Sequence, residues 1–174
     1  MNVVIRQELE NDHEAVYQVV KSAFEKMELA SGDEPDLVNR LRKSEAFIPE
    51  LSLVAELDGQ IIGHILFTRM KIGDHPSLAL APVAVLAKYQ GQGVGSKLIV
   101  VGHRIAREMG YHSVVLVGHP GYYPRFGYLP ASRWKITAPF EVPDEAFMVL
   151  ELVEGGLDGV SGEIEYAKEF FEKG

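Results

Sequence analysis

The sequence predicts an α/β (α+β) fold, and three observations support this prediction. Two helical patterns near the N-terminus each place apolar residues on one side. Two β-rich runs, residues 51–57 and 60–71, are joined by Asp58-Gly59, a dipeptide that favours a two-residue hairpin turn. An apolar strand then leads through a glycine-rich turn into an amphipathic helix, over Val83 to Lys97.

The N-terminal part is expected to contain a short strand at Val3 to Arg6, followed by two helices. The second helix begins around Pro35, a residue favoured in a first helical turn, and one of its sides is apolar. The acidic segment Ser31 to Asp36 is interpreted as a connection rather than a metal site. Asn11 or Asp12 can cap the first helix, whose apolar residues follow the 3.6-residue period: Ala15, Val16, Val19, Val20, Ala23, Phe24 and Met27.

The central part continues with a strand from about Leu78 to Leu86. A helix follows, starting at Gly93 or Gly95 and running to Met109, with Gly110 as its stop. Ser113 to Val117 is a short continuous apolar run, which is typical of a strand buried on both faces.

The C-terminal part is predicted to be mostly strand. A short helical turn near Tyr122 to Phe126 precedes strands at Trp134 to Thr137 and Phe147 to Leu152. The tail from Gly155 fits two structures, because residues 163–166 alternate as in a strand while residues 164–171 also present one apolar helical side.

Composition limits the function classes. The 174 residues are 47% hydrophobic, enough for one domain that buries roughly 70% of its unfolded surface. Since the chain has no cysteine, disulfides, thiolate metal sites and a cysteine-bound intermediate are excluded. The start of the chain resembles neither a signal nor a transit peptide, and the most apolar run has ten residues where a bilayer needs roughly 20. We therefore expect a soluble, cytoplasmic protein that does not bind membranes.

Charge is distributed unevenly along the chain. The net charge is −8, but residues 75–140 carry +6 and the remainder carries −14. The overall acidity argues against a nucleic-acid partner, since such binding depends on contacts to phosphates. The basic central segment suits a small anionic ligand, and the acidic remainder suits a cation. The alternative is that buried strands merely lack charges and the helical charges are solvated.

The glycine-rich turn is the most informative motif. Gln90 to Gly95 reads Gln-x-x-Gly-x-Gly between a strand and a helix, where backbone N–H groups and a helix N-terminus can bind phosphate. The chain contains no Walker A pattern, and Ser96 stands where the dinucleotide fingerprint requires its third glycine.

This turn and the strand before it resemble the acetyl-CoA-binding motif of the GNAT superfamily of acyltransferases. A later segment, Tyr122 to Tyr128, is similar to the second motif of that family, and the order of elements agrees over residues 3–128. The resemblance implies a single domain over residues 1–174, with C-terminal strands added at about 132–174. It also implies a mixed, mostly antiparallel sheet flanked by helices, with a central splay where acetyl-CoA binds.

The resemblance assigns roles to particular residues. Tyr123 matches the position of the general acid that protonates the departing thiolate, although it could instead pack as core beside Tyr122 and Phe126. Lys88, Lys97 and Arg104 are placed to reach phosphates, with Lys97 favoured, or all three are solvated. The positions that match the cofactor site are Val83, Ala84, Val85, Gln90, Gly91, Gln92, Gly93, Val94, Gly95, Ser96 and Lys97.

The general base is left open by the sequence. Glu56 and His119 are candidates, and proton loss through water is the third possibility. The strand that leads into the glycine-rich turn, Leu78 to Leu86 (the motif strand), has no acidic residue. His119 stands where most family members have asparagine. Ala87 stands where family members often have proline, a difference that affects only the entry to the turn. No metal is expected, because the other histidines lack metal-ligand spacing: His13, His64, His75, His103 and His112.

The resemblance implies transfer of an acetyl group from acetyl-CoA to a primary amine, directly within a ternary complex. The acceptor, a small molecule or a protein, is not specified by the sequence. Two alternatives remain: a non-catalytic acyl-CoA-binding sensor or interaction module on the same fold, and a nucleotide-phosphate binder that shares the glycine turn. The edge strands expected after Trp134 also make a homodimer a reasonable prediction.

Overall fold

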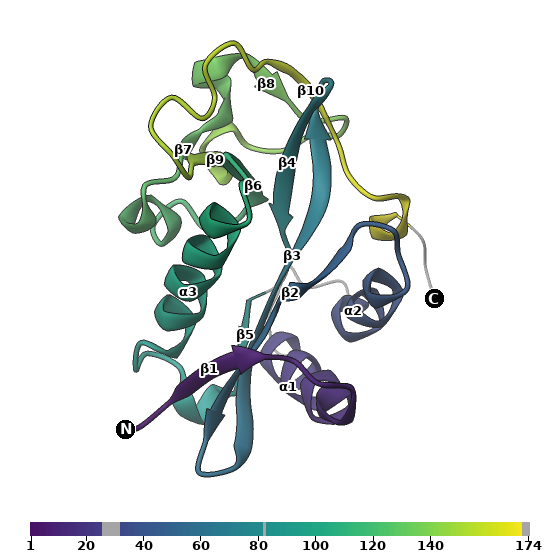
Figure 1. Ribbon diagram of the computed structural model, residues 1–174, viewed down its shortest axis with the longest axis vertical. Helices are drawn as coiled ribbons and strands as arrows, with labels where there is room; N and C mark the ends of the chain where they lie inside the picture. Colours follow the sequence, from purple (N-terminus) through teal and green to yellow (C-terminus); the bar gives the residue numbers. More distant parts are fainter. Residues whose placement is uncertain (26–31, 82, 172–174) are drawn as a thin grey trace.

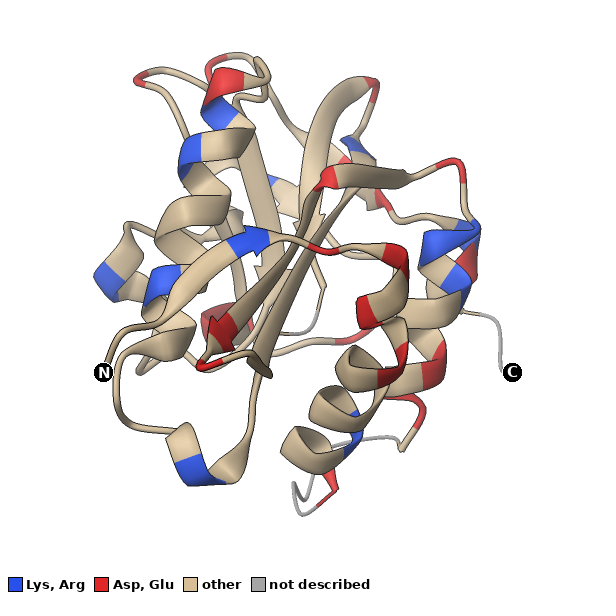
Figure 2. Ribbon diagram, turned by 60° about the horizontal axis from the view of Figure 1, so that its bottom comes forward, with Lys and Arg blue, Asp and Glu red and all other residues tan. Residues whose placement is uncertain are grey.

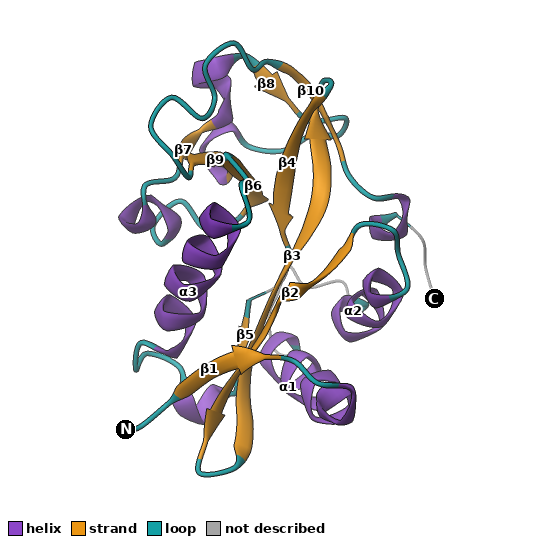
Figure 3. Cartoon of the chain, viewed as in Figure 1, coloured by secondary structure: helices purple, strands orange, loops and turns teal. Residues whose placement is uncertain are grey.

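The computed structural model describes residues 1–25, 32–81 and 83–171. Its sheet runs as a diagonal band, with α3 on one face and the α1–α2 pair on the other (Figures 1 and 3). The helices are α1 (His13–Phe24), α2 (Glu34–Arg42) and α3 (Val94–Glu108). The strands are β1 (Val4–Gln7), β2 (Phe47–Leu57), β3 (Gln60–Ile72), β4 (His75–Leu80), β5 (Ala84–Val85), β6 (Ser113–Val117), β7 (Leu129–Pro130), β8 (Ile136–Thr137), β9 (Phe147–Glu151) and β10 (Gly162–Glu165).

The sheet is mixed and mostly antiparallel, as predicted. Its main path is β1-β2-β3-β4-β6-β9-β7, while β5 and β10 both pair with β3. β4 runs parallel to β6, and β10 runs parallel to β8; the other pairs are antiparallel. No helix in the described ranges is both long and apolar enough to cross a membrane.

The β2–β3 hairpin forms at the predicted dipeptide. Asp58 and Gly59 both have positive φ angles, 50° and 82°, which is the backbone geometry of a type I′ turn. Alternate side chains of the hairpin then face opposite layers. Val54 and Leu66 pack toward α1 and α2, whereas Leu53 and Phe67 pack toward α3. The hairpin is therefore the common wall of two hydrophobic cores.

The predicted continuous strand Leu78 to Leu86 is wrong: it is interrupted between β4 and β5. β4 pairs with β3 up to Leu80↔Phe67, and β5 resumes at Ala84↔His64. Between these two pairs the β4–β5 segment has three residues and β3 has two. One extra residue on one strand is the definition of a β-bulge. Residue 82 is outside the described ranges.

The bulge opens the sheet. β4 pairs with β6 at Leu78↔Val114 and Ala79↔Val115, whereas the pairing found for β5 is with β3. The predicted central splay is thus located where β5 and β6 separate. A single sequence cannot show such an opening, because it depends on the registers of three strands.

Several smaller expectations are corrected. Trp134 ends a 3-10 helix, Ala131–Trp134, so only Ile136–Thr137 of the predicted strand is extended. α2 begins at Glu34, which puts the end of the predicted connection inside a helix; Ser31 and Met27 lie outside the described residues. The tail contains both predicted structures, a strand at β10 and then a 3-10 helix, Lys168–Phe170.

Asp12 occupies the N-cap position of α1, but its side chain makes no cap hydrogen bond to the helix. Its carboxylate instead accepts from the Leu9 backbone N–H at 2.7 Å and from Arg6 Nη1 at 2.7 Å. Ion pairing with β1 therefore replaces the capping role expected from the sequence.

Acidic residues gather at the first turns of the N-terminal helices η1 (Glu10–Asp12), α1 and α2. Figure 2 shows these acidic residues on the side of the sheet away from α3. α3 carries Lys97, Arg104 and Arg107 beside Glu108, while Lys21, Arg40 and Arg42 lie in the last turns of α1 and α2. Each helical layer therefore carries charges of both signs.

Candidate active site

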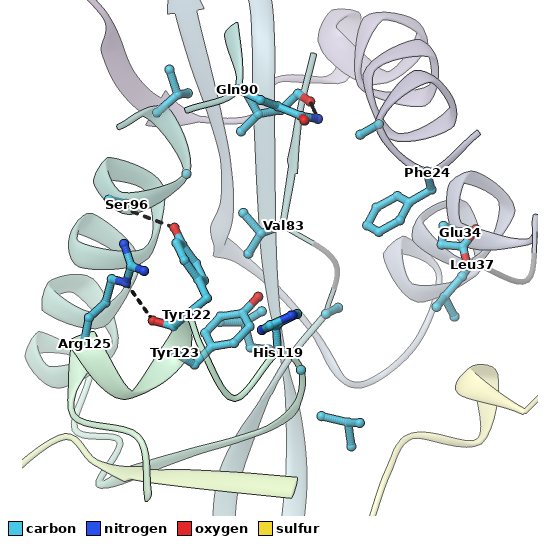
Figure 4. Close-up of a pocket in the computed structure, with 18 of the residues that line it drawn as sticks. Phe24, Glu34, Leu37, Val83, Gln90, Ser96, His119, Tyr122, Tyr123 and Arg125 are labelled. Carbon is cyan, nitrogen blue, oxygen red and sulfur yellow. Dashed lines mark hydrogen bonds between the residues drawn. The ribbon is translucent and has the colours of Figure 1, made fainter. Parts of the chain in front are cut away.

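A cavity of about 1090 Å³ lies at the splay. The glycine turn, the start of α3 and the 3-10 helix Tyr123–Phe126 form one side, and the end of α1 and the start of α2 form the other. In Figure 4, Phe24, Glu34 and Leu37 face Ser96 and Tyr122 from across the strand that carries Val83.

The glycine turn has the geometry of an anion cradle. Gly91 and Gly93 have φ angles of 76° and 86°, and a Cβ at either position would meet no atom within 4 Å. Open space thus lies against the backbone at the N-terminus of α3, where N–H groups and the helix dipole favour a negative group. The Gln90 side-chain amide donates to the Val85 carbonyl at 2.9 Å, which ties the turn to the motif strand. These residues fit a phosphate-bearing cofactor.

The motif strand has one paired edge and one edge toward the splay. The Leu86 N–H donates to the Ile62 carbonyl of β3 at 2.9 Å. Because hydrogen bonds alternate along an antiparallel strand, the N–H and C=O of Val85 point to the opposite edge. The Val85 carbonyl there already accepts from Gln90, so an extended amide chain at this edge would meet the Val85 N–H and the second lone pair of that carbonyl.

The cavity lining includes eight of the eleven predicted cofactor residues. Ala84 is outside the lining because it is 1% exposed and packs in the core beneath α1. Gln92 and Lys97 are also outside; Gln92 instead donates to the Lys88 carbonyl at 3.2 Å. The eight that line the cavity are Val83, Val85, Gln90, Gly91, Gly93, Val94, Gly95 and Ser96.

Tyr122 belongs to the α3 side of the cavity. Its hydroxyl lies 3.3 Å from Ser96 Oγ. Arg125 packs beside this residue: its guanidinium lies 4.6 Å from the Tyr122 ring centroid and its Nε donates to the Tyr122 carbonyl at 2.9 Å. Sequence reasoning did not assign Arg125 to the site.

Tyr123 points into the middle of the cavity, and its hydroxyl is directed toward Val83 (Figure 4). Its ring packs edge-on against Tyr122 and Tyr128, at centroid distances of 5.1 and 5.8 Å. Burial, together with the neighbouring Tyr122, raises the pKa of Tyr123 to about 12. The phenol therefore keeps its proton at neutral pH.

His119 lines the cavity next to Tyr123. Its Nδ1 accepts a hydrogen bond from the Gly121 N–H at 3.1 Å. In the neutral ring the proton is then on Nε2, so the ring's lone pair is already used. Accepting a proton from a substrate would require the other tautomer and the loss of this hydrogen bond.

Glu56 is outside the described lining of the cavity. It lies on β2 and accepts from Arg6 of β1, at 3.1 Å from Nε and 2.8 Å from Nη2. Arg6 also pairs with Asp12 at 2.7 Å. The structure thus places Glu56 in a three-residue ion-pair cluster rather than beside Tyr123.

The far wall of the cavity was not found by sequence reasoning. It combines the end of α1, the start of α2, the loop after β8 and the residues after β10, which are distant in the chain and share no motif. Its residues include Phe24, Glu34, Leu37, Phe140, Tyr166, Phe170 and Phe171. Among the described residues, no group of three or more histidines and carboxylates is arranged to hold a metal ion.

An open sheet with a glycine cradle at a helix N-terminus fits the acyltransferase class that the sequence motifs resemble. Comparisons with known proteins agree. Residues 13–128 match the model of the acetyltransferase (GNAT) family. The uncharacterized N-acetyltransferase YhbS of Escherichia coli (strain K12) is 34% identical over 171 residues, covering 97% of this chain and 98% of the relative.

Two further relatives extend the comparison. YjhQ of E. coli (strain K12), also an uncharacterized N-acetyltransferase, is 44% identical over 117 residues, which cover 64% of this chain and 65% of that relative's length. The chain thus spans less than two thirds of YjhQ. A GNAT family acetyltransferase from Brucella melitensis, solved in complex with acetyl-CoA, is 33% identical with a TM-score of 0.81, covering 97% of this chain and 98% of that one.

The crystal structure of E. coli YhbS in complex with CoA has a TM-score of 0.90 at 32% identity, covering 100% of this chain and 94% of that one. The chain therefore belongs to the GNAT acetyltransferase family, whose members are N-acetyltransferases that use acetyl-CoA.

Proposed function

We propose that this protein transfers an acetyl group from acetyl-CoA to a primary amine, directly and within a ternary complex. One observation supports the proposal most: the glycine cradle and the Tyr123 phenol open into the same cavity, with Val83 between them. The relatives solved with CoA and acetyl-CoA support the choice of donor.

The residues that would hold the donor are those of the turn and the motif strand. The backbone N–H groups between Gly91 and Gly95 bind the pyrophosphate, and the free edge at Val85 pairs with the amides of the pantetheine arm. The bound donor supplies an acetyl thioester. Placing both reactants in one cavity is worth roughly 7 to 11 kcal/mol in the best cases. Cofactor contacts by Ala84, Gln92 and Lys97 stay predictions.

Two groups of the chain act on the reacting atoms. A backbone N–H at the opening of the sheet polarises the carbonyl that is attacked; one such donor is worth about 3 kcal/mol. Tyr123 holds a proton on Oη at neutral pH, and in this proposal it donates that proton to the leaving thiolate. Tyr123 is therefore the proposed general acid.

The acceptor must lose a proton before it attacks, which costs about 4 to 5 kcal/mol for a lysine-like amine at pH 7. We assign this step to water in the cavity. His119 is the neighbouring side chain that can relay the proton, once it has exchanged its hydrogen bond with Gly121. Glu56, held by Arg6, is the weaker candidate.

One observation favours the alternative of a non-catalytic acyl-CoA sensor. Both predicted bases are already engaged, His119 with Gly121 and Glu56 with Arg6. The two functions are separated by measuring acetyl-CoA turnover against a panel of primary amines, with Tyr123→Phe and, as matched control, Tyr111→Phe outside the described cavity lining. An acetyltransferase loses turnover in Tyr123→Phe and keeps it in Tyr111→Phe. A sensor binds acetyl-CoA and releases no CoA thiol with any amine.

A cytoplasmic location and a homodimer also belong to the proposal. Light scattering on the purified protein measures the oligomeric state; a mass of about 19.3 kDa would contradict the dimer.

A further inference from the structure

The direction in which the Tyr123 phenol points depends on the rings around it. Within the part of the chain that the structure describes, no hydrogen bond joins its hydroxyl to another residue. Tyr122 and Tyr128 pack edge-on against its ring, with interplanar angles of 81° and 77°. Whatever fixes these two rings therefore also fixes the hydroxyl of Tyr123.

Both neighbouring rings are tied to the same helix, α3. Tyr122 Oη lies 3.3 Å from Ser96 Oγ in the first part of the helix (Figure 4). Tyr128 Oη lies 2.8 Å from Nε2 of His103, farther along it. Ser96 and His103 are about two helical turns apart, so they project from one face of α3. One helix thus holds the rings on both sides of Tyr123.

His103 is the stronger and more deeply buried of the two attachments. It is 5% exposed, and its ring lies between Phe67, at a centroid distance of 6.0 Å, and Tyr128, at 5.6 Å. Burial, together with the charge of Arg107, lowers the pKa of His103 to about 4, so the ring is neutral at neutral pH. Burying a polar ring is costly unless it is hydrogen-bonded, and the Tyr128 phenol supplies that bond.

The helix itself is pressed against the sheet at this point. Gly102 precedes His103, and a Cβ at position 102 would collide with the Phe67 ring of β3. The N-terminus of the same helix forms the glycine cradle. One rigid element therefore carries both the donor cradle and the residue that holds Tyr128.

We propose that His103 is a positioning residue for acetyl transfer: its hydrogen bond fixes the Tyr128 ring, and that ring directs the Tyr123 hydroxyl toward the leaving thiolate. The inference rests on the proposed function, in which the Tyr123 Oη proton passes to the sulfur. His103 and Tyr128 are both outside the described cavity lining, so they act through Tyr123 and not on the reactants.

Two substitutions separate the hydrogen bond of His103 from its bulk. His103→Leu keeps an apolar side chain and removes the bond, whereas His103→Gln keeps an amide that can donate or accept near Nε2. We expect His103→Leu to lower kcat by about fivefold to tenfold, and His103→Gln to stay within about twofold of the wild type. The calorimetric Kd for acetyl-CoA should change by less than about twofold in both, because the cradle is intact.

Tyr128→Phe removes the same bond from the other partner and keeps the ring. It should lower kcat as much as His103→Leu, and the double variant should lose no more than either single variant. In the Tyr123→Phe background, His103→Leu should not lower the residual rate further. Tyr111→Phe, which removes a phenol hydroxyl outside the described cavity lining, is the matched control and should keep the wild-type kcat.

NMR on the donor-free protein with ¹³C-labelled tyrosine provides a readout that needs no turnover. The Tyr123 ring signals are those that disappear in Tyr123→Phe. His103→Leu should shift them, and His103→Gln should leave them close to their wild-type positions. Unshifted Tyr123 signals in folded His103→Leu would overturn the inference.

The kinetic results distinguish this inference from the proposed function. Full kcat in His103→Leu, with turnover lost in Tyr123→Phe, overturns the inference and leaves the acetyltransferase standing. Equal losses in His103→Leu and His103→Gln also overturn it, since bulk would then explain the effect. Full kcat in Tyr123→Phe, or no acetylation of any amine, overturns the proposed function and the inference with it.

Discussion

The ring of Tyr123 fills the space that a side chain at position 118 would need. A Cβ at Gly118 would lie 2.5 Å from Tyr123 Cε2, closer than such atoms approach one another. Gly118 follows β6 and Tyr123 begins the next 3-10 helix, so the end of one strand sets the position of the proposed acid.

The first prediction concerns this contact. Gly118→Ala should move the Tyr123 ring and lower kcat by about tenfold or more, while acetyl-CoA affinity stays unchanged, since small displacements at a reacting centre are costly. The measurement is steady-state acetylation together with calorimetry. In the double variant Gly118→Ala/Tyr123→Phe, the losses should not add, because both remove the same proton donor. Additive losses would show that Gly118→Ala acts elsewhere.

The second prediction concerns the pH dependence of the reaction. Burial raises the pKa of Tyr123 to about 12, so the phenol is protonated at every pH below about 10. The rate at saturating substrate should therefore show no alkaline decline between pH 7 and pH 10, a range that a pH–rate profile covers. Such a decline, abolished by Tyr123→Phe, would contradict the raised pKa.

The third prediction concerns Glu56. Glu56→Gln should leave kcat within about twofold of the wild type and lower the free energy of unfolding by at most about 1 kcal/mol. The Arg6–Glu56 pair is partly exposed, 30% and 32%, and exposed pairs contribute little. Steady-state kinetics and urea unfolding measure the two effects. A hundredfold loss of kcat with normal stability would instead make Glu56 the general base.

The fourth prediction concerns stability in acid. Complete burial lowers the pKa of His64 to about 4, against the opposing charge of Glu8 3.7 Å away. Arg42 and His13 also lower it, and Ser52 Oγ lies 3.1 Å from Nε2. The pKa of this histidine in the unfolded chain is near 6.5. The contribution of buried, neutral His64 to the free energy of unfolding is therefore present above pH 6.5 and is lost as the pH falls toward 4.

His64 alone should lower the free energy of unfolding at pH 5 by roughly 2 kcal/mol relative to pH 7. Urea unfolding at the two pH values measures it. His64→Gln should reduce this pH-dependent loss, whatever it does to stability at pH 7. An unchanged difference between pH 7 and pH 5 in His64→Gln would contradict the prediction.

Local signals predicted much of this fold. The Asp58-Gly59 turn, α3 between Gly93 and Gly110, and β6 all depend on residues that are neighbours in sequence, and the structure has each of them. The break in the motif strand was missed, because a bulge depends on the registers that β3 and β6 impose on it.

The donor side of the site was predictable for the same reason, since the glycine turn and the Tyr122–Tyr123 segment are continuous motifs. The far wall was not. Glu34 of α2 and Phe140 of the loop after β8 line the same cavity only because the fold brings these distant segments to one opening in the sheet. Glu56 was proposed as a base from its place on the hairpin, but its partner Arg6 lies on β1, and no local pattern links the two.

The most direct test is calorimetry of acetyl-CoA binding to the wild type and to Gly93→Asp, with Gly93→Asn as matched control. Both side chains must adopt the left-handed backbone at position 93, φ 86°, and both project into the open cradle. Only aspartate adds a negative charge there. The account predicts micromolar binding by the wild type, a smaller loss in Gly93→Asn and loss of binding in the folded Gly93→Asp protein. No binding by the wild type, or equal binding by the two variants, would contradict it.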